Sequence, residues 1–452
     1  MVSDRKIDPA ATRSPMSYRL CLLCSFVLLA RPQDVLTFLQ PMRPALLVMV
    51  VAIGALVFGG RIKDLTSALS MPESKRYLLF YLIMILGIPF AYHQRIAFEG
   101  VILGYSVNVL FFMLLVSQVT TLARLKSLVW VMCLATLMYA VVGGVLQIGN
   151  FSDGRFQVVG SAFDPNDTAY VLVSLFPLCV YFARFDEGLV KRVVAIAVVC
   201  SAIAIILITG SRGGILALGA VLLIMLLTKT GGIDKGFKIF FVTMLAVTWF
   251  LMADRVDVER YLSLSDIASD YNVTGQEGRL NVWRGAISLA VANPITGIGV
   301  ECFEYAYFLA RELAGNSYLR WHSVHNSFLQ IASEVGVVGF SVFILINVRS
   351  VLTFLRISRT TWESDSQSRE SREMGALGGL MLLGFVGLLV SGFFLSQGYS
   401  IFSTLYFAFA AVVGRINGSV SVTYAVSPKA PTTRIGTAGL SKGSVPRVGS
   451  GM

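Results

Sequence analysis

The sequence carries little charge for its length. Asp, Glu, Lys and Arg make up 14% of its 452 residues, and hydrophobic residues make up 55%. Soluble proteins carry about 25% charged residues, so this balance excludes a water-soluble domain and a mainly disordered chain. With six cysteines, the chain is not a disulfide scaffold either.

The motifs of nucleotide and metal chemistry are also missing. There is no GxxxxGK[ST] or HExxH, and Gly297-Ile-Gly299 lacks the strand–helix context of a dinucleotide site. His322 and His325 are close in sequence, but no obvious third ligand accompanies them, so we predict no metal site and no cofactor. The net charge of +11 requires no nucleic acid, because membrane proteins concentrate basic residues in their cytoplasmic loops.

What the sequence does contain is a series of long apolar runs. A membrane-spanning helix needs roughly 20 apolar residues, and about twelve runs approach that length, although the first and the eighth are short. The sequence therefore predicts an all-α fold: a polytopic transmembrane bundle of about twelve spans in a lipid bilayer, with a large, partly helical periplasmic loop. The runs lie near 18–30, 44–60, 77–92, 97–118, 127–148, 167–185, 193–210, 214–228, 239–253, 327–348, 375–395 and 401–414.

Lysine placement predicts the topology. With the N-terminus in the cytoplasm and about twelve crossings, every lysine falls on the cytoplasmic side, and one miscounted central span would scatter them over both sides. Both termini are then expected in the cytoplasm. The lysines are Lys6, Lys63, Lys75, Lys126, Lys191, Lys229, Lys235, Lys238, Lys429 and Lys442.

The same topology divides the chain into four regions. Residues 1–253 contain spans one to nine, 254–325 form the large periplasmic loop, and 326–416 contain the last three spans. Residues 417–452 are rich in Ser, Thr, Gly and Pro, and we expect them to be a disordered cytoplasmic tail.

On the expected outer side, the strong bases are all arginines. The planar guanidinium binds phosphate through two parallel hydrogen bonds, so the cluster favours an anionic ligand there. In the shorter outer loop, Arg155 and Asn166 are candidates for lining a cavity, and Asp164-Pro165-Asn166 favours a turn and a helix N-cap. The arginines are Arg31, Arg95, Arg155, Arg212, Arg255, Arg260, Arg279, Arg284, Arg311 and Arg320.

The apolar stretch 193–228 contains a predicted turn. As one helix it would be roughly 54 Å long, against a bilayer core of about 30 Å. The chain should therefore turn at Thr209-Gly210-Ser211-Arg212-Gly213-Gly214, which puts Arg212 at the outer surface. Backbone N–H groups of such small residues can converge on an anion; a glycine turn with a snorkelling arginine is the alternative.

The end of the large loop supplies a candidate base. A neutral imidazole near pH 7 is suited to accept a proton from a sugar hydroxyl, so we take His325 for this role and add His322 and Asn326 as substrate-binding candidates. Glu334, nine residues further on, is about 180° around a helix from His325. We expect it to make a structural hydrogen bond within the bundle.

A helix is predicted to begin at Gly278-Arg279 within the large loop. Arg279 and Arg284 are about 140° apart on it, so they should not bind one phosphate from one face. Its expected apolar stripe consists of Leu280, Trp283 and Ile287.

Taken together, these segments resemble the O-antigen ligase and O-antigen polymerase superfamily, bacterial membrane glycosyltransferases of the GT-C kind. Each piece is short, and their order, spacing and common membrane face make the combination specific. The pieces, spread over about 160–345, are Pro165-Asn166, Ser211–Gly214, Gly278-Arg279 with Trp283, His325-Asn326 with Leu329, and Glu334 with Gly336 and Gly339.

The resemblance implies transfer of a glycan from an undecaprenyl-diphosphate carrier to an acceptor hydroxyl, on the periplasmic face of the bacterial inner membrane and without nucleotide or metal. The acceptor would be lipid A-core or another glycan or a protein. By analogy, Arg212 and Arg279 would hold the diphosphate, with Arg284 as a further candidate, and His325 would activate or orient the acceptor hydroxyl.

Alternative functions remain at this point. A ligase attaches a finished polymer to its acceptor, whereas a polymerase joins repeat units, and both would share the donor site. A transporter or flippase for polysaccharide or lipid belongs to another class; it would need charged residues along a path through the membrane, and the spans contain few.

Overall fold

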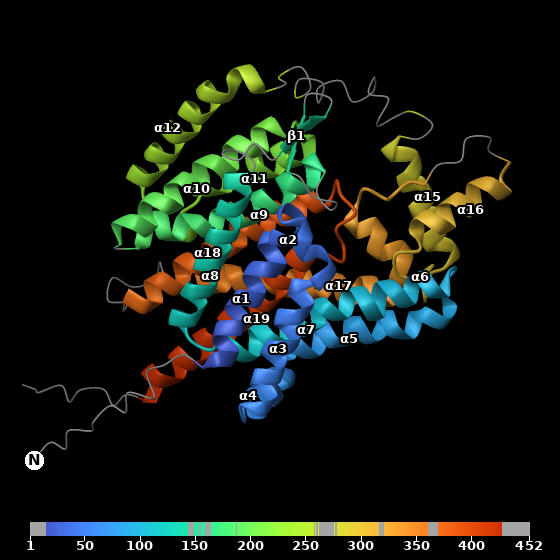
Figure 1. Ribbon diagram of the computed structural model, residues 1–452, viewed down its shortest axis with the longest axis horizontal. Helices are drawn as coiled ribbons and strands as arrows, with labels where there is room; N and C mark the ends of the chain where they lie inside the picture. Colours follow the sequence, from blue (N-terminus) through green and yellow to red (C-terminus); the bar gives the residue numbers. More distant parts are fainter. Residues whose placement is uncertain are drawn as a thin grey trace, which may run out of the picture.

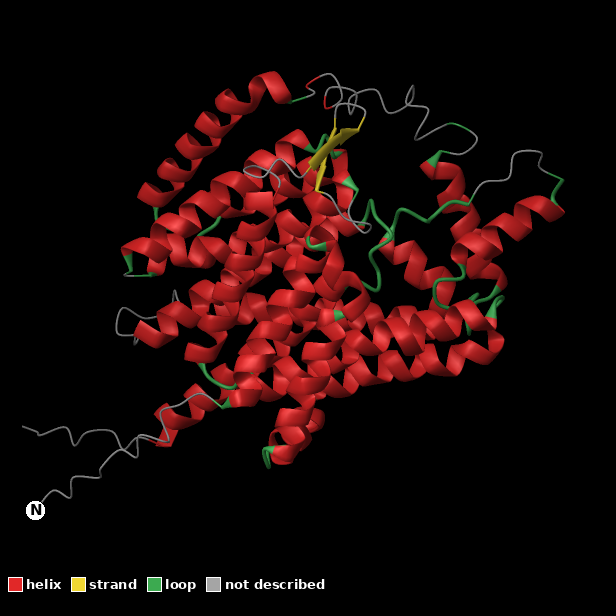
Figure 2. Cartoon of the chain, viewed as in Figure 1, coloured by secondary structure: helices red, strands yellow, loops and turns green. Residues whose placement is uncertain are grey.

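In the computed structural model, most of the described residues belong to helices, which are joined by loops and turns and one short β-hairpin (Figure 2). The all-α class predicted from the sequence is confirmed. The structure describes residues 15–142, 149–152, 155–158, 164–186, 188–256, 258, 261, 275, 278–315, 321–359 and 369–426. Much of the predicted large loop between 257 and 277, and the predicted tail after 426, lie outside these residues.

The first part of the chain forms a group of helices and ends at the β-hairpin. Strands β1 and β2 pair antiparallel, with Gly149 opposite Val158 and Ser152 opposite Arg155. The helices are α1 (Met16–Ala30), α2 (Pro32–Val35), α3 (Pro44–Phe58), α4 (Ile62–Ser70), α5 (Pro72–Gly87), α6 (Gln94–Phe98), α7 (Ser106–Gln118) and α8 (Leu122–Ala140), with short turns η1 (Thr37–Met42), η2 (Ile88–Phe90) and the π-helical η3 (Glu99–Tyr105), followed by β1 (Gly149–Ser152) and β2 (Arg155–Val158).

The second part contains the longest helices of the bundle. These are α9 (Pro165–Phe185), α10 (Leu189–Ile208), α11 (Arg212–Leu227), α12 (Lys235–Met252), α15 (Arg279–Ala292), α16 (Phe303–Leu313), α17 (Ser327–Arg359), α18 (Arg369–Gly392) and α19 (Ile401–Val426), with single turns η5 (Thr230–Gly232) and η6 (Ala253–Arg255). Helix α19 continues past Asn417, so the segment 417–426, which we predicted to be disordered, is helical.

Nine helices in the described part of the chain are long and apolar enough to cross a membrane. Two shorter apolar helices, Met16–Ala30 and Arg212–Leu227, match the first and eighth predicted runs, and α5 with 16 residues matches the third. The fold is therefore that of a multi-pass membrane protein. The count of about twelve spans stays a prediction.

Helices α9 and α18 form the centre of the bundle (Figure 1). Their most apolar windows are 89% and 83% buried inside the protein, against 17% for the window in α12, which lies at one edge. Gly384 of α18 allows this close packing, because a Cβ there would lie 2.4 Å from the carbonyl oxygen of Ser174 in α9. Tyr406 of α19 donates its hydroxyl to the same carbonyl.

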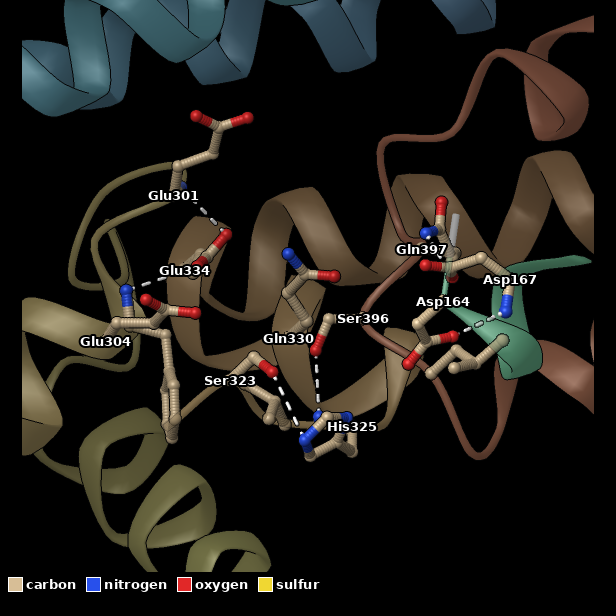
Figure 3. Close-up of a pocket in the computed structure, with 13 residues that line it drawn as sticks. Asp164, Asp167, Glu301, Glu304, Ser323, His325, Gln330, Glu334, Ser396 and Gln397 are labelled. Atoms are coloured by element: carbon tan, nitrogen blue, oxygen red, sulfur yellow. Dashed lines mark hydrogen bonds between the residues drawn. The ribbon is translucent and has the colours of Figure 1, made fainter. Parts of the chain in front are cut away.

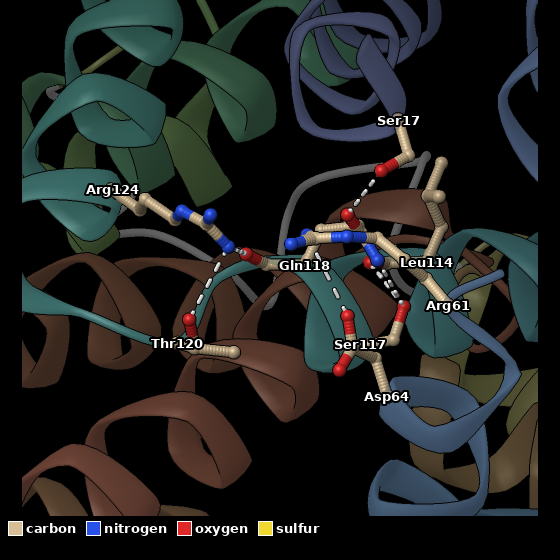
Figure 4. A network of polar contacts seen from close by, with 8 residues as sticks. All are labelled: Ser17, Arg61, Asp64, Leu114, Ser117, Gln118, Thr120 and Arg124. Atoms are coloured by element: carbon tan, nitrogen blue, oxygen red, sulfur yellow. Dashed lines mark hydrogen bonds and ion pairs between the residues drawn. The ribbon is translucent and has the colours of Figure 1, made fainter. Parts of the chain in front are cut away.

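At the opposite end of the bundle from α15 and α16, polar contacts join α1, α7 and α8 (Figure 4). Ser17 Oγ donates to Gln118 Oε1 at 2.8 Å, and Arg124 Nη1 donates to the Gln118 carbonyl at 2.8 Å. The Arg124 guanidinium also lies 4.9 Å from the centre of the Tyr18 ring. These contacts satisfy polar groups where three helices converge.

Helix α17 is broken at Gly336, which has φ +69° and ψ −179°. The segment 294–299 binds the break: Ile298 N donates to the Ser333 carbonyl at 2.9 Å, Gly299 N donates to the Glu334 carbonyl at 3.0 Å, and Val337 N donates to the Pro294 carbonyl at 2.7 Å. Backbone groups freed by a helix break inside a membrane protein need such internal partners. The Gly-Ile-Gly segment thus has a structural role.

We predict that Gly336→Ala destabilises the protein. A residue with a side chain at φ +69° costs about 1–3 kcal/mol, and its Cβ would lie 2.3 Å from the Ile295 carbonyl oxygen. Thermal unfolding of the solubilised protein should show a lower midpoint. Gly219→Ala in α11 is the matched control, because nothing lies within 4 Å of its Cβ. An unchanged midpoint for Gly336→Ala would contradict the role of the break.

Candidate active site

A cavity of about 490 Å³ opens where the beginnings of α9 and α17 meet the loop between α18 and α19 and the start of α16. Three glutamates lie at one end of it, two aspartates and Gln397 lie at the other, and His325 lies between them (Figure 3). The lining residues are Asp164, Asp167, Glu301, Phe303, Glu304, Ser323, Val324, His325, Gln330, Glu334, Leu395, Ser396 and Gln397.

His325 is held in an unusual backbone conformation immediately before α17. Its φ is +50°, which costs about 1–3 kcal/mol for a residue with a side chain. Its N–H donates to Ser396 Oγ at 2.8 Å, and its Nε2 lies 3.3 Å from Ser323 Oγ. The next residue, Asn326, is buried and caps α17: its Oδ1 accepts from the N–H groups of Phe328 and Leu329, both at 3.0 Å. In this structure Asn326 therefore orients the helix that follows His325.

Glu334 makes the structural hydrogen bonds that the sequence predicted. Its carboxylate accepts from the N–H groups of Glu301 at 3.0 Å and Phe303 at 3.2 Å, which fixes the start of α16. The expectation that Glu334 faces away from His325 was wrong, because both residues line the cavity. The helical angle does not apply, since α17 begins only at Ser327.

The loop Leu395–Gly398 was not predicted as part of the site, yet it joins three of its walls. Ser327 Oγ donates to the Leu395 carbonyl at 2.7 Å and accepts from Gln397 N at 3.0 Å. Gln397 Nε2 donates to Asp167 Oδ1 at 2.8 Å. The only signal in the sequence is a short polar segment, Ser-Gln-Gly, between two apolar runs.

The shorter outer loop forms a polar chain that leads away from the cavity. Asp164 caps α9, as predicted, by accepting from Asn166 N at 2.7 Å and Asp167 N at 2.8 Å. Asn166 Nδ2 donates to Asp164 Oδ2 at 3.1 Å, and Asn166 Oδ1 accepts from Arg155 Nη2 at 2.9 Å. Arg155 Nε donates to the Thr209 carbonyl at 3.0 Å. Arg155 and Asn166 therefore connect the cavity wall to the α10–α11 turn.

The predicted turn between α10 and α11 is present. Gly210 has φ +60°, and Ser211 Oγ accepts from Gly214 N at 3.1 Å to cap α11. Gly214 permits close packing on α9, because a Cβ there would lie 2.5 Å from Ala169 Cβ. Arg212, the first residue of α11, is half-buried at this turn.

Arg279 begins α15, and its charge lies close enough to act on His325. The predicted apolar stripe of α15 was wrong in part. Leu280 and Ile287 are 40% and 50% exposed. Both faces of this helix are apolar, so periodicity alone did not select the packed one. The face that packs consists of Val282, Ala286 and Leu289.

Trp283, the third member of the expected stripe, is half-buried and ties α15 to the segment before α17, because its Nε1 donates to the Val324 carbonyl at 3.0 Å. Arg284 is exposed and donates to Asn281 on its own helix at 3.2 Å. The ring of His322 packs edge-on against Tyr307, 6.4 Å between centroids. Neither Arg284 nor His322 lines the cavity.

The charged groups around His325 shift its pKa in opposite directions. Burial lowers the pKa of His325, and the charges of Arg279 and His322 lower it further, whereas Asp164 opposes them. Burial, followed by the charge of Glu304, raises the pKa of Glu301. Among the described residues, five carboxylates and no lysine or arginine line the cavity. The imidazole thus lies between two groups of carboxylates and also within reach of the charge of Arg279.

A helical membrane bundle with a half-buried imidazole in a polar cavity defines a polytopic membrane protein with a candidate active site. A family model described as O-antigen ligase matches residues 196–344, which include Arg212, Arg279 and His325. Residues 196–344 thus form a region similar to O-antigen ligases, and the resemblance given by the motifs is confirmed. At this level the protein is a membrane glycosyltransferase of polysaccharide biosynthesis. No curated protein matches the chain.

The two charges beside His325 should shift its pKa in opposite directions. Arg279→Gln removes a cation that disfavours the imidazolium, so the pKa of His325 should rise. Asp164→Asn removes an anion that favours it, so the pKa should fall further. The pH dependence of carbethoxylation of His325 by diethylpyrocarbonate, followed by mass spectrometry, measures both shifts.

Arg284→Gln is the control for this experiment, because Arg284 is exposed and bonded to Asn281. It should leave the titration of His325 unchanged. Equal titration curves for Arg279→Gln and the wild type would show that Arg279 is not an electrostatic neighbour of His325.

Proposed function

We propose that this protein transfers a glycan from an undecaprenyl-diphosphate carrier to an acceptor hydroxyl at the periplasmic face of the bacterial inner membrane. The observation that carries the proposal is the position of His325, which lies in a polar cavity and also within reach of the charge of Arg279. One side chain can therefore serve an acceptor in the cavity and a donor on the arginine side.

His325 acts as the general base. Its lowered pKa keeps the imidazole neutral near pH 7, as a base requires. The acceptor oxygen attacks the anomeric carbon and passes its proton to an imidazole nitrogen. The bond between this carbon and the diphosphate oxygen breaks, and the electron pair leaves with the diphosphate. Direct in-line attack inverts the anomeric configuration.

Arg212 and Arg279 bind the diphosphate of the donor and stabilise the charge that develops on it as it leaves. Each is the first residue of a helix, where backbone N–H groups also favour an anion. The acidic wall of the cavity disfavours a diphosphate, so the donor lies on the arginine side of His325. The reaction needs no nucleotide, because the departing diphosphate supplies the driving force.

In this proposal Arg155 and Asn166 hold the α10–α11 turn in place relative to the cavity wall. Arg155 bonds to Thr209 in the turn and to Asn166, and Asn166 bonds to Asp164 in the wall. Arg284, which is exposed, and His322, which packs on Tyr307, contact the larger substrates at the rim.

The proposed topology has both termini in the cytoplasm and the cavity in the periplasm. The lysine distribution supports it, together with ion pairs among charged residues at helix ends away from the cavity. Lys126 at the beginning of α8 pairs with Glu373 near the beginning of α18 at 2.7 Å. Arg184 at the end of α9 pairs with Asp234, which caps α12.

Within this family we favour a ligase, with lipid A-core or another glycan or protein as acceptor, over a polymerase. A deletion strain separates them by the material trapped on the carrier at the outer leaflet. Full-length polymer on the carrier indicates a missing ligase, and single repeat units indicate a missing polymerase. Glycan trapped at the inner leaflet would instead indicate a flippase and contradict the transferase.

We predict that His325→Ala reduces transfer in reconstituted vesicles by about 10²–10⁴-fold, the usual value of general-base assistance. The backbone bond from residue 325 to Ser396 does not depend on the side chain, so the protein should still insert and purify normally. His93→Asn is the control, because His93 caps α6 through Nδ1, packs on Tyr305 and does not line the cavity. Full activity of His325→Ala would remove this residue from the mechanism.

Arg212→Lys should also impair transfer, even though it keeps the positive charge. A lysine ammonium cannot form the two parallel hydrogen bonds of a guanidinium with a diphosphate oxygen pair. The loss should appear as a higher KM for the lipid-diphosphate donor. Arg95→Lys is the matched control, since the Arg95 side chain is 81% exposed and pairs with Glu99. Equal donor kinetics for both variants would refute the role of Arg212.

A further inference from the structure

Gln330 carries a hydrogen-bonding group that its neighbours do not use. It lies in the first turn of α17, five residues after His325, lines the cavity and is only 9% exposed. Its Oε1 accepts from Gly398 N at 3.1 Å, which fixes the orientation of the amide because only the oxygen can accept from that N–H. In the described part of the chain, Nε2 has no hydrogen-bond partner, and Figure 3 shows the amide within the cavity.

This amide N–H group faces the cavity and is therefore available to a ligand. Three of the five carboxylates that line the same cavity already accept hydrogen bonds from the protein. Glu334 accepts from two backbone N–H groups, Asp164 caps α9, and Asp167 gives one oxygen to Gln397. A carboxylate has about four acceptor positions, so Asp167 can still accept from a ligand. The wall therefore offers a fixed donor beside free acceptor capacity.

We propose that this cavity is a subsite for an unphosphorylated sugar ring and that Gln330 recognises it by donating Nε2–H to a sugar oxygen. Each sugar hydroxyl both donates and accepts, so it matches a wall where an amide N–H stands near carboxylate oxygens. A phosphate would only accept, and it would meet five carboxylates in the same cavity. The identity of this sugar as part of the acceptor rests on the proposed function; its binding does not.

A protection experiment tests binding without any transfer reaction. Diethylpyrocarbonate modifies accessible neutral histidines, and the chain has three, so His325 reports on the cavity and His93 serves as an internal control. The probes are the methyl glycosides of glucose, galactose and mannose, with glucose 6-phosphate and inorganic pyrophosphate as anionic competitors. At least one neutral glycoside should slow modification of His325 more than either anion, and none should change His93.

Gln330→Glu isolates the amide donor. It keeps an oxygen that accepts from Gly398 N and removes the Nε2–H group, so the loop stays bonded. Half-protection of His325 should then require about three- to tenfold more glycoside, the loss expected for one hydrogen bond. Gln94→Glu is the matched control, because the Gln94 amide is exposed and donates to the Pro89 carbonyl. It should leave protection unchanged.

Two results would overturn the proposal. One is protection of His325 by pyrophosphate or glucose 6-phosphate that exceeds protection by all three glycosides. The other is an equal glycoside requirement in Gln330→Glu and the wild type. In vesicles that catalyse transfer, Gln330→Glu should raise the KM for acceptor by a similar factor and leave the KM for donor unchanged. Protection without any transfer would leave the sugar subsite standing and remove the proposed function.

Discussion

The break of α17 at Gly336 determines the geometry of the site. A continuous helix would satisfy its own carbonyls, whereas the break leaves those of Ser333 and Glu334 for Ile298 and Gly299. The outer segment is thereby bound to the bundle by backbone hydrogen bonds, and the Glu334 carboxylate fixes the beginning of α16. The acidic end of the cavity exists because this helix is interrupted. A glycine at positive φ and a buried carboxylate thus serve one purpose, which is to bind an extramembrane loop to a membrane helix.

The other end of the cavity depends on a loop of four residues. Leu395–Gly398 contacts the beginnings of α9 and α17 through Ser327, Gln330 and Asp167. Ser396 in this loop also accepts a hydrogen bond from the backbone N–H of His325. This bond holds the imidazole between two groups of carboxylates. Helices α18 and α19 therefore contribute to the site only through the segment that joins them. Their apolar lengths supply the packing that keeps this segment in place.

Much of this architecture could be predicted from local sequence. Apolar runs predicted the helices, small residues predicted the α10–α11 turn, and Asp-Pro-Asn predicted the cap of α9. The acidic cavity could not be predicted, because its lining residues come from four separate segments of the chain. The pKa shifts of its groups also depend on burial, which only the folded structure shows. The packed face of α15 was also missed, since Leu280 and Ile287 are as apolar as Val282 and Leu289. For Glu334 the hydrogen bonds were predicted correctly and the direction wrongly, because the helical angle was counted from His325, which precedes the first residue of α17.

Among the described residues, the cavity beside His325 is lined by carboxylates, whereas Arg279 acts on His325 without lining the cavity. This arrangement has a chemical consequence that a single arginine-lined pocket would not have. In such a pocket an acceptor hydroxyl would compete with the diphosphate for the same guanidinium groups, and the imidazole would be surrounded by cations. Here carboxylates line the cavity on both sides of the imidazole, and Arg279, which is not among the lining residues, helps to keep the imidazole neutral. When the imidazole takes a proton, Asp164 stabilises the cation that forms. The base is therefore neutral before the reaction and stabilised during it, through charges that no single segment of the chain could supply.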